Sequence, residues 1–158
     1  METQHAFFAA IRNGDLEEIK QLLAEHPKII NSYDERGSTP LILATYYERQ
    51  RIAELLLAKG APVDAKDGSG NTALMGVCFK GFYEMANMLI LAGADVNVIN
   101  AMGSSCLIYA ATFNRLNIAK LLLEHGADPK VKDARGQTAL DHAKSQEASE
   151  MIALLEAY

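Results

Sequence analysis

The chain has 158 residues, of which 49% are hydrophobic and 22% are charged, and its formal net charge at pH 7 is −5. This composition is typical of a folded domain and excludes a disordered chain. The acidic balance argues against a nucleic-acid partner, because affinity for a phosphate backbone comes largely from clustered Lys and Arg side chains. No apolar segment approaches the ~20 residues that cross a bilayer, so no membrane association is expected.

The first segment, residues 1–33, is predicted to form an N-terminal capping repeat with two helices. It follows the plan of the repeats described next, with Gly14 at the place of Gly81, only if one extra residue is allowed in HPKIINSYD. Terminal repeats are usually atypical, which fits this irregular spacing. Its start, METQHAFFAAI, lacks the basic region of a secretory signal.

The segment DERGSTPLILA, which begins at Asp34, recurs three times along the rest of the chain. DGSGNTALMGV begins at Asp67, NAMGSSCLIYA at Asn100 and DARGQTALDHA at Asp133, so successive starts are 33 residues apart. A fixed period of this length is typical of stacked supersecondary units. The sequence therefore predicts repeats at residues 34–66, 67–99 and 100–132, followed by a C-terminal capping repeat at residues 133–158.

Each repeat contains the signals of a turn followed by two helices. Gly37 suits a turn residue with positive φ, Thr39 is a good N-cap, and Pro40 fits the first helical position. These signals predict short helices that begin near residues 40, 73, 106 and 139. A second helix follows, with apolar residues at i, i+3 and i+4 such as Ile52, Leu55 and Leu56. One unit cannot bury both of its faces, so the units are expected to stack.

The period, the D-x-x-G-x-T-P-L-x-x-A pattern of residues 34–44 and the segment LLLEHGADPK at residues 121–130 resemble ankyrin repeats. The resemblance covers almost the whole chain and implies an all-α repeat protein, a solenoid of stacked helix-turn-helix units with β-turn or hairpin loops. One departure concerns the family's T-P-L-H motif, in which Ile42, Met75, Ile108 and Asp141 replace the usual His.

The resemblance also implies a function. Ankyrin-like proteins commonly bind proteins on a concave surface made by the turn tips and the ends of the short helices. We therefore expect a non-catalytic interaction module, an adaptor or a regulatory subunit, that binds a protein or peptide. By repeat position, the predicted contact residues are Glu35, Arg36, Tyr46, Tyr47, Asn71, Phe79, Lys80, Met102, Phe113, Arg115 and Arg135.

Four of these residues, which we call the aromatic ladder, occupy one pair of repeat positions that the fold does not need to bury: Tyr46, Tyr47, Phe79 and Phe113. Exposed aromatic side chains in stacked units would form an interface with a partner. The alternative is that some of these rings pack on the helix of the adjacent repeat. Phe82 and Tyr83, nearer the second helix, are expected to be structural.

A second class of function, an enzyme or a small-ligand protein, could use a site near Asp141 and His142. Adjacent residues on a helix point ~100° apart, so a hydrogen-bonded dyad is not expected. Asp95 and Asp128 are expected to stabilise turns rather than to bind a metal. No recognised catalytic motif occurs in the sequence, and we expect neither enzymatic activity nor a cofactor.

Cys78 and Cys106 lie in apolar helical segments and are expected to be small core residues. One pair of cysteines in a chain of this length does not indicate a disulfide framework. A location in the reducing cytoplasm is therefore expected, and we separately expect the protein to be a monomer.

Overall fold

The computed structural model describes residues 2–158, which contain ten α-helices, one 3₁₀ helix and no strand. None of the helices in this range is long and apolar enough to cross a membrane. In chain order the helices are α1 (Glu2–Asn13), α2 (Leu16–Glu25), η1 (Pro27–Asn31), α3 (Pro40–Tyr46), α4 (Gln50–Ala58), α5 (Ala73–Lys80), α6 (Tyr83–Leu91), α7 (Cys106–Thr112), α8 (Leu116–Glu124), α9 (Ala139–Ser145) and α10 (Ser149–Glu156).

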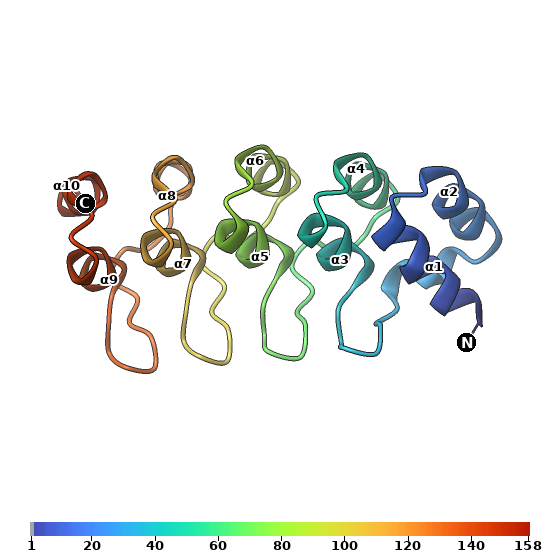
Figure 1. Cartoon of the computed structure of the whole chain (residues 1–158), viewed down its shortest axis with the longest axis horizontal. Helices are drawn as coiled ribbons and strands as arrows, with labels where there is room; N and C mark the ends of the chain where they lie inside the picture. The colour runs from blue at the N-terminus through green and yellow to red at the C-terminus, as the bar shows by residue number, and fades with distance from the viewer. Residues whose placement is uncertain (1) are drawn as a thin grey trace.

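The helices form two parallel rows along the molecule (Figure 1). The inner row consists of α1, α3, α5, α7 and α9, and each inner helix packs against the next. The outer row consists of α2, α4, α6, α8 and α10, each paired with the inner helix that precedes it. Long loops project to one side between successive units (Figure 1). The predicted all-α solenoid of helix-turn-helix units is confirmed.

The four predicted N-caps, at residues 39, 72, 105 and 138, each start an inner helix. The hydroxyl oxygen of each cap accepts a hydrogen bond from the backbone N–H three residues further on, at 3.0 to 3.3 Å. Each bond satisfies one of the N–H groups that have no partner within the helix. The helices consequently begin at residues 40, 73, 106 and 139, as the sequence predicts.

The Asp or Asn that opens each repeated segment orders the turn before the inner helix. Asp34 Oδ1 accepts two hydrogen bonds, from the backbone N–H groups of Arg36 and Ser38, both at 2.9 Å. The equivalent oxygens of residues 67, 100 and 133 accept the same pair of bonds. The glycine three residues further on has φ between 74° and 81° in all four turns, which a glycine adopts without steric cost.

The second polar side-chain atom of the Asp or Asn that opens each turn has different partners in different turns. Asn100 Nδ2 donates to Asn71 Oδ1 at 2.8 Å and to the Tyr109 hydroxyl at 2.9 Å. Asp133 Oδ2 lies 2.8 Å from His142 Nε2. Hydrogen bonds from the Gln137 backbone and from His142 lower the pKa of the Asp133 carboxyl. The third and fourth turns are therefore each tied to a helical side chain nine residues further on.

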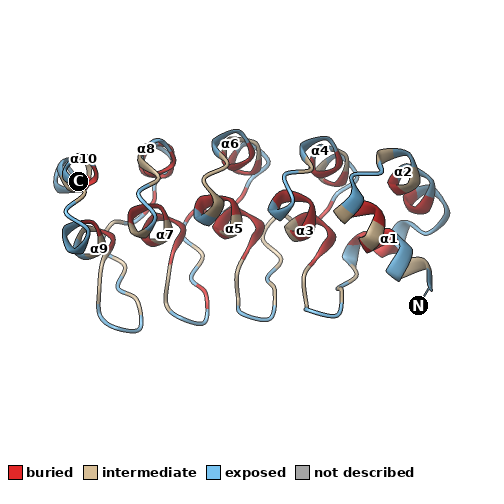
Figure 2. Ribbon diagram, in the orientation of Figure 1, coloured by how far each residue is buried: buried red, intermediate tan, exposed pale blue. Residues whose placement is uncertain are grey.

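Buried residues concentrate in the inner helices and on the sides of the outer helices that face them (Figure 2). The apolar stripe of the outer helices places Leu56, Leu89 and Leu122 in the core with no exposed surface. Cys78 and Cys106 are also fully buried and unbridged, as predicted. The neighbouring Cys106 thiol and burial raise the pKa of Cys78, so its reactive thiolate form is disfavoured.

Two features of the backbone could not be read from the repeat pattern. The segment HPKIINSYD contains the 3₁₀ helix η1, which accommodates the irregular spacing between the first two units. Glu48, Asn114 and Glu147 adopt φ values of 54° to 57° at the position of Gly81. A left-handed residue thus lies between the paired helices in all five units, although only Gly14 and Gly81 are glycines, which favour this conformation.

The stripe assignment predicts a large cost for truncating a buried leucine. Leu89→Ala should lower the free energy of unfolding by about 2–5 kcal/mol, because it leaves a cavity between α6 and its neighbours. Leu91→Ala is the matched control, since this leucine ends the same helix with 74% of its surface exposed, and it should change stability by less than about 0.5 kcal/mol. Urea unfolding measures both, and equal losses would contradict the assignment.

The link between Asp133 and His142 predicts a specific dependence on pH. Since the pKa of Asp133 is lowered in the folded state, its contribution to stability is complete above the pKa of the unfolded chain and is lost as pH falls below about 4. Asp133→Asn retains the two acceptor bonds of the turn, as Asn100 shows, but removes the titrating group. Wild type should therefore lose more stability than this variant between pH 7 and pH 3.

Urea melts across this pH range provide the measurement, and Asp67→Asn provides the control. Asp67 opens an equivalent turn, but the residue nine positions further on is Gly76, so no imidazole faces it. Identical pH profiles for wild type and Asp133→Asn would show that the contact with His142 does not contribute to stability.

Candidate partner-binding surface

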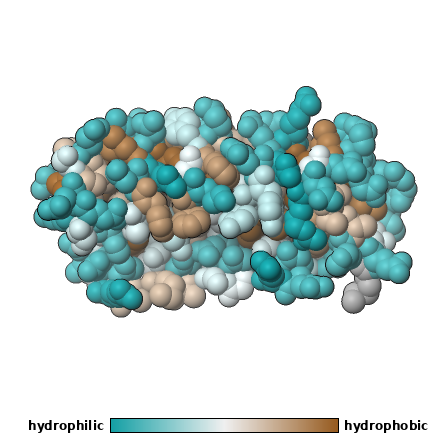
Figure 3. Space-filling model, viewed as in Figure 1, coloured by the Kyte–Doolittle hydropathy of each residue, from teal (hydrophilic) through white to brown (hydrophobic). Residues whose placement is uncertain are grey.

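The projecting turns and the C-terminal ends of the inner helices together form one face of the molecule, which we call the inner face. The aromatic ladder lies at the ends of α3, α5 and α7, and each of its four side chains is 39% to 44% exposed. Apolar surface is visible over α5 and α7 and continues into paler surface over α3 (Figure 3). The ladder residues are thus neither core nor fully solvated.

The C-terminal half of the ladder is a compact cluster. The Phe79 and Phe113 rings are perpendicular, with centroids 4.7 Å apart, and the Tyr109 ring stacks on Phe113 at 6.4 Å. Tyr109 is held by the hydrogen bond that its hydroxyl accepts from Asn100. We call Phe79, Phe113 and Tyr109 the phenyl platform. Tyr109 was not among the predicted site residues, because its position on the inner helix is not aromatic in the other repeats.

The N-terminal half of the ladder includes a cation. The Tyr46 and Tyr47 rings meet edge to face at 5.5 Å, and Lys80 Nζ lies 4.5 Å from the centroid of the Tyr46 ring and 5.7 Å from that of Phe82. These distances allow cation–π attraction, which links the second unit to the third. Phe82 packs against the core as predicted, whereas Tyr83 is 41% exposed, so its expected structural role is not supported.

Arg115 has a structural role beside the ladder. Its Nε and Nη2 atoms donate to the Phe79 carbonyl oxygen at 3.3 and 3.0 Å, across the boundary between two units. Arg49 makes the same pair of bonds to the Arg12 carbonyl oxygen, at 3.2 and 2.6 Å. The end of α5 is therefore fixed by the next unit, which also fixes the backbone that carries the Phe79 ring. Contact between Arg115 and a partner stays a prediction.

A glycine makes room for each of these arginines. A Cβ atom added to Gly81 would lie 2.8 Å from Arg115 Nε, and one added to Gly14 would lie 3.3 Å from the Arg49 guanidinium. Both glycines have positive φ, 82° and 76°. The side chain of an ordinary residue at either position would push against the guanidinium.

The repeat position of Gly81 holds a residue with a side chain where the following unit has no arginine at the position of Arg115. Glu48 precedes a unit with Phe82 at the arginine position, and Asn114 precedes a unit with Ala148 there. The backbone is left-handed in both cases, so conformation alone does not require glycine. Packing of the guanidinium explains why glycine occurs at residues 14 and 81.

The remaining predicted contact residues lie on the projecting turns. Glu35, Arg36, Met102 and Arg135 are exposed, and the backbone N–H groups of the last three donate to the residue that opens their turn. Asn71 is only partly exposed, because its side-chain oxygen accepts a hydrogen bond from Asn100. The turn tips are thus ordered by their backbones while most of their side chains face solvent.

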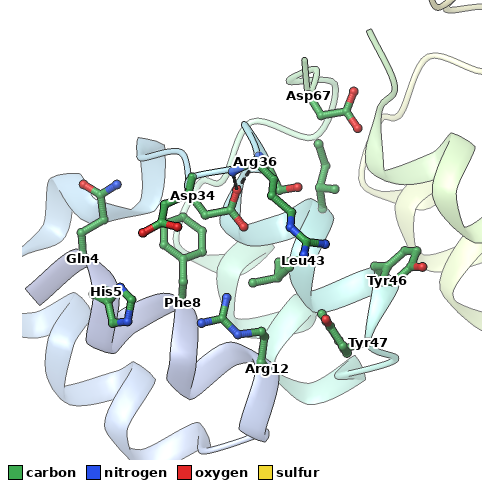
Figure 4. A pocket seen from close by; sticks show the side chains of 13 residues that line it. Gln4, His5, Phe8, Arg12, Asp34, Arg36, Leu43, Tyr46, Tyr47 and Asp67 are labelled. Atoms are coloured by element: carbon green, nitrogen blue, oxygen red, sulfur yellow. Dashed lines mark hydrogen bonds between the residues drawn. The ribbon is translucent and has the colours of Figure 1, made fainter. Parts of the chain in front are cut away.

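A hollow of about 570 Å³ opens at the N-terminal end of the inner face, between α1, α3 and the turn before α3. We call it the N-terminal hollow. Arg12 and Arg36 extend into it from opposite sides, and two residues of the ladder, Tyr46 and Tyr47, close one end (Figure 4). The other lining residues are Gln4, His5, Phe8, Asp34, Glu35, Ser38, Ile42, Leu43 and Asp67. The repeat pattern gave no sign of the residues from α1, because the first unit lacks the repeated motif.

The alternative site near Asp141 and His142 does not assemble as a dyad. Asp141 Oδ2 accepts a hydrogen bond from Thr138 N at 3.0 Å. Hydrogen bonding to the backbone and the side chain of Thr138 lowers the pKa of the Asp141 carboxyl. His142 instead faces Asp133. Among residues 2–158 no three side chains of the metal-binding types form a cluster.

Asp95 and Asp128 stabilise the loops in which they lie, as predicted. Asp95 Oδ1 accepts a hydrogen bond from Asn97 N at 2.8 Å, and Asp128 Oδ1 accepts one from Lys130 N at 2.9 Å. Asn97 also connects neighbouring units, because its Oδ1 accepts from Asp128 N and its Nδ2 donates to Gly126 O. These carboxylates therefore have a structural use.

The pairing of Gly81 with Arg115 predicts energetic coupling between the two residues. Gly81→Asn should lower stability by about 1–2 kcal/mol, because an asparagine tolerates positive φ, as Asn114 does, but its Cβ would displace the guanidinium. In an Arg115→Ala background the same change should cost about 1 kcal/mol less. A double-mutant cycle of urea melts measures the difference, and strictly additive losses would contradict the packing argument.

Comparison with known protein families agrees with this architecture. A family model described as ankyrin repeats (3 copies) matches residues 6–100 and residues 74–157 of the chain. The two matches overlap at residues 74–100 and together extend from α1 to the end of α10. They confirm the resemblance seen in the turn, cap and stripe residues, and the chain belongs to the ankyrin repeat family.

Proposed function

We propose that this protein is a non-catalytic interaction module that holds a segment of a partner protein on its inner face. Ankyrin repeats are generally protein–protein interaction modules, which supports this class of function. The observation that carries the proposal is the aromatic ladder. Four aromatic side chains at the ends of three successive inner helices retain 39% to 44% of their surface in contact with solvent.

The ladder is well suited to binding because its rings are already ordered. Phe79 and Phe113 hold each other in a perpendicular arrangement, and Lys80 rests on the Tyr46 ring. These rings would therefore lose little conformational entropy when a partner covers them, which lowers the free-energy cost of association. Buried aromatic anchors commonly contribute about 2 kcal/mol or more each to binding.

The proposal includes the role of adaptor or regulatory subunit rather than enzyme. Asp141 caps its own helix and His142 is engaged by Asp133, so both side chains have structural partners. We further propose a monomer in the cytoplasm. Two buried, unbridged cysteines suit a reducing compartment. Glu156 is exposed at the place where residues 57, 90 and 123 are apolar, which does not favour stacking of another copy at this end.

A comparison of two variants tests the proposal. Changing Tyr46, Phe79 and Phe113 together to Ala should weaken partner binding on the order of 10⁴-fold, since it removes three rings that each contribute about 2 kcal/mol. The matched control is Tyr83→Ala with Tyr158→Ala, which removes exposed aromatic rings outside the inner face. Pull-down from native extract with quantitative mass spectrometry, followed by titration of the partner found, provides the measurement.

Folding of both variants is checked by urea melts, because Phe113 also contacts Tyr109. A protein retained by wild type and by the control, but lost by the ladder variant, is the expected result. If all three baits retain the same proteins with equal affinity, the partner binds elsewhere and the proposal is wrong.

A further inference from the structure

At three of the four boundaries between units, the following unit holds a carbonyl oxygen at the end of the preceding inner helix. The donor and acceptor residues are Arg49 with Arg12, Arg115 with Phe79, and Gln146 with Thr112. The exception is Tyr46, at the end of α3, because Phe82 occupies the position of Arg115 and has no side-chain donor. Within residues 2–158, no hydrogen bond from the third unit reaches the Tyr46 oxygen. The end of α3 is therefore not fixed by the unit that follows it.

The projecting turns are also separate at this boundary, which lies between the second and third units. The N–H groups of Ala101 and Ala134 each donate to a carbonyl oxygen of the preceding turn at 3.0 Å, but in the described chain no such bond joins the turns of the second and third units. The approach of successive turns is also wider here. A Cβ atom added to the turn glycine would lie 3.4 Å from the next turn at Gly37, 3.1 Å at Gly70 and 2.9 Å at Gly103.

Few contacts remain between the second and third units. The inner helices α3 and α5 pack as the other inner pairs do, so the apolar core is continuous. The outer helices α4 and α6 pack less closely than the other neighbouring outer pairs. The polar contacts across this boundary, as far as the structure describes the chain, are two. Asp95 N donates to the Asp64 carboxylate at 3.1 Å, and Lys80 Nζ lies over the Tyr46 ring.

The units on either side of this boundary are joined more firmly to their own neighbours. Hydrogen bonds link the third unit to the fourth at the turns, at the inner helices and at the outer loops, through the pairs Asn100 with Asn71, Ala101 with Ser69, Arg115 with Phe79, Asp128 with Asn97, and Asn97 with Gly126. The fifth unit is joined to the fourth at its turn and its inner helix. In the first two units, the Arg49 guanidinium holds the end of α1.

We propose that the boundary between the second and third units is a hinge, at which residues 2–66 move relative to residues 67–158. The pivot is the apolar contact between α3 and α5 (Figure 1). The ends of the inner helices and the turns move apart, because no bond from the third unit holds the Tyr46 oxygen. In a stack whose units contact only their neighbours, motion concentrates at the interface with the fewest bonds.

The hinge divides the aromatic ladder. Tyr46 and Tyr47 lie on one side and the phenyl platform lies on the other, so the distance between these two halves changes as the hinge moves. A partner that covers both halves fixes this distance and loses binding free energy to the ordering. That consequence rests on the proposed function. The hinge itself does not, and it is tested on the free protein.

Pulsed electron paramagnetic resonance on the spin-labelled full chain measures the movement. Labels are placed at one exposed repeat position of successive outer helices, namely residues 51, 84, 117 and 150. Labels at Arg51→Cys and Asn117→Cys span the hinge, whereas labels at Glu84→Cys and Glu150→Cys span two boundaries within residues 67–158. The distance distribution of the first pair should be broader than that of the second. The two native cysteines are fully buried and should take up no label.

A hinge-locking variant tests the cause of the movement. Glu48→Gly with Phe82→Arg introduces at this boundary the combination found in Gly81 and Arg115. It should narrow the distribution of the hinge-spanning pair to that of the other pair, which should not change. Glu48→Gly alone is the matched control, since it makes the space without adding a donor, and it should leave the hinge-spanning pair broad.

Equal widths for the two label pairs in the otherwise native chain would overturn the proposal. A hinge-spanning distribution that stays broad in the hinge-locking variant would also overturn it, provided that urea melts show this variant to be as stable as wild type. If the variant does not fold, the comparison of the two label pairs decides alone. None of these results bears on the proposed function, which the pull-down with the ladder variant tests.

Discussion

At the start of each turn, one side-chain oxygen accepts hydrogen bonds from two backbone N–H groups. The fold and the inner face both depend on this interaction. In the turn of Asp34 this oxygen fixes the N–H groups of residues 36 and 38, immediately before the Thr39 cap. The turn therefore delivers the chain to the inner helix in a defined direction. It also leaves tip side chains such as Arg36 exposed, so one local contact orders both the scaffold and the surface that we propose for partner binding.

Stacking converts this local regularity into a continuous surface. Phe79 and Phe113 do not occupy the same repeat position, since they are 34 rather than 33 residues apart. Their rings nevertheless meet, because α5 and α7 pack side by side and Arg115 joins the next unit to the end of α5. The surface is thus a property of the boundary between units rather than of any single unit, and a change at that boundary would disturb it.

The features that were predictable from the sequence are those encoded within one unit. The caps, the glycine turns and the leucine stripes depend on neighbours a few residues away, and the structure has them where the pattern places them. The features that were missed connect separate units. Tyr109 joins the platform through Asn100, Gly81 accommodates Arg115, and the N-terminal hollow combines α1 with the following turn. Neither the period nor local propensity contains this information, because each contact depends on which residue the adjacent unit supplies.

The departure from Asp at residue 100 shows how one substitution can serve both scaffold and surface. The side-chain oxygen of Asn100 performs the same turn function as the aspartates, so the fold is unaffected. Its amide, however, donates to Asn71 and to the Tyr109 hydroxyl, whereas an ionised carboxylate has no proton to donate. A carboxylate here would also place a negative charge beside the phenyl platform. Asparagine therefore holds the platform in place and adds no charge to this part of the inner face.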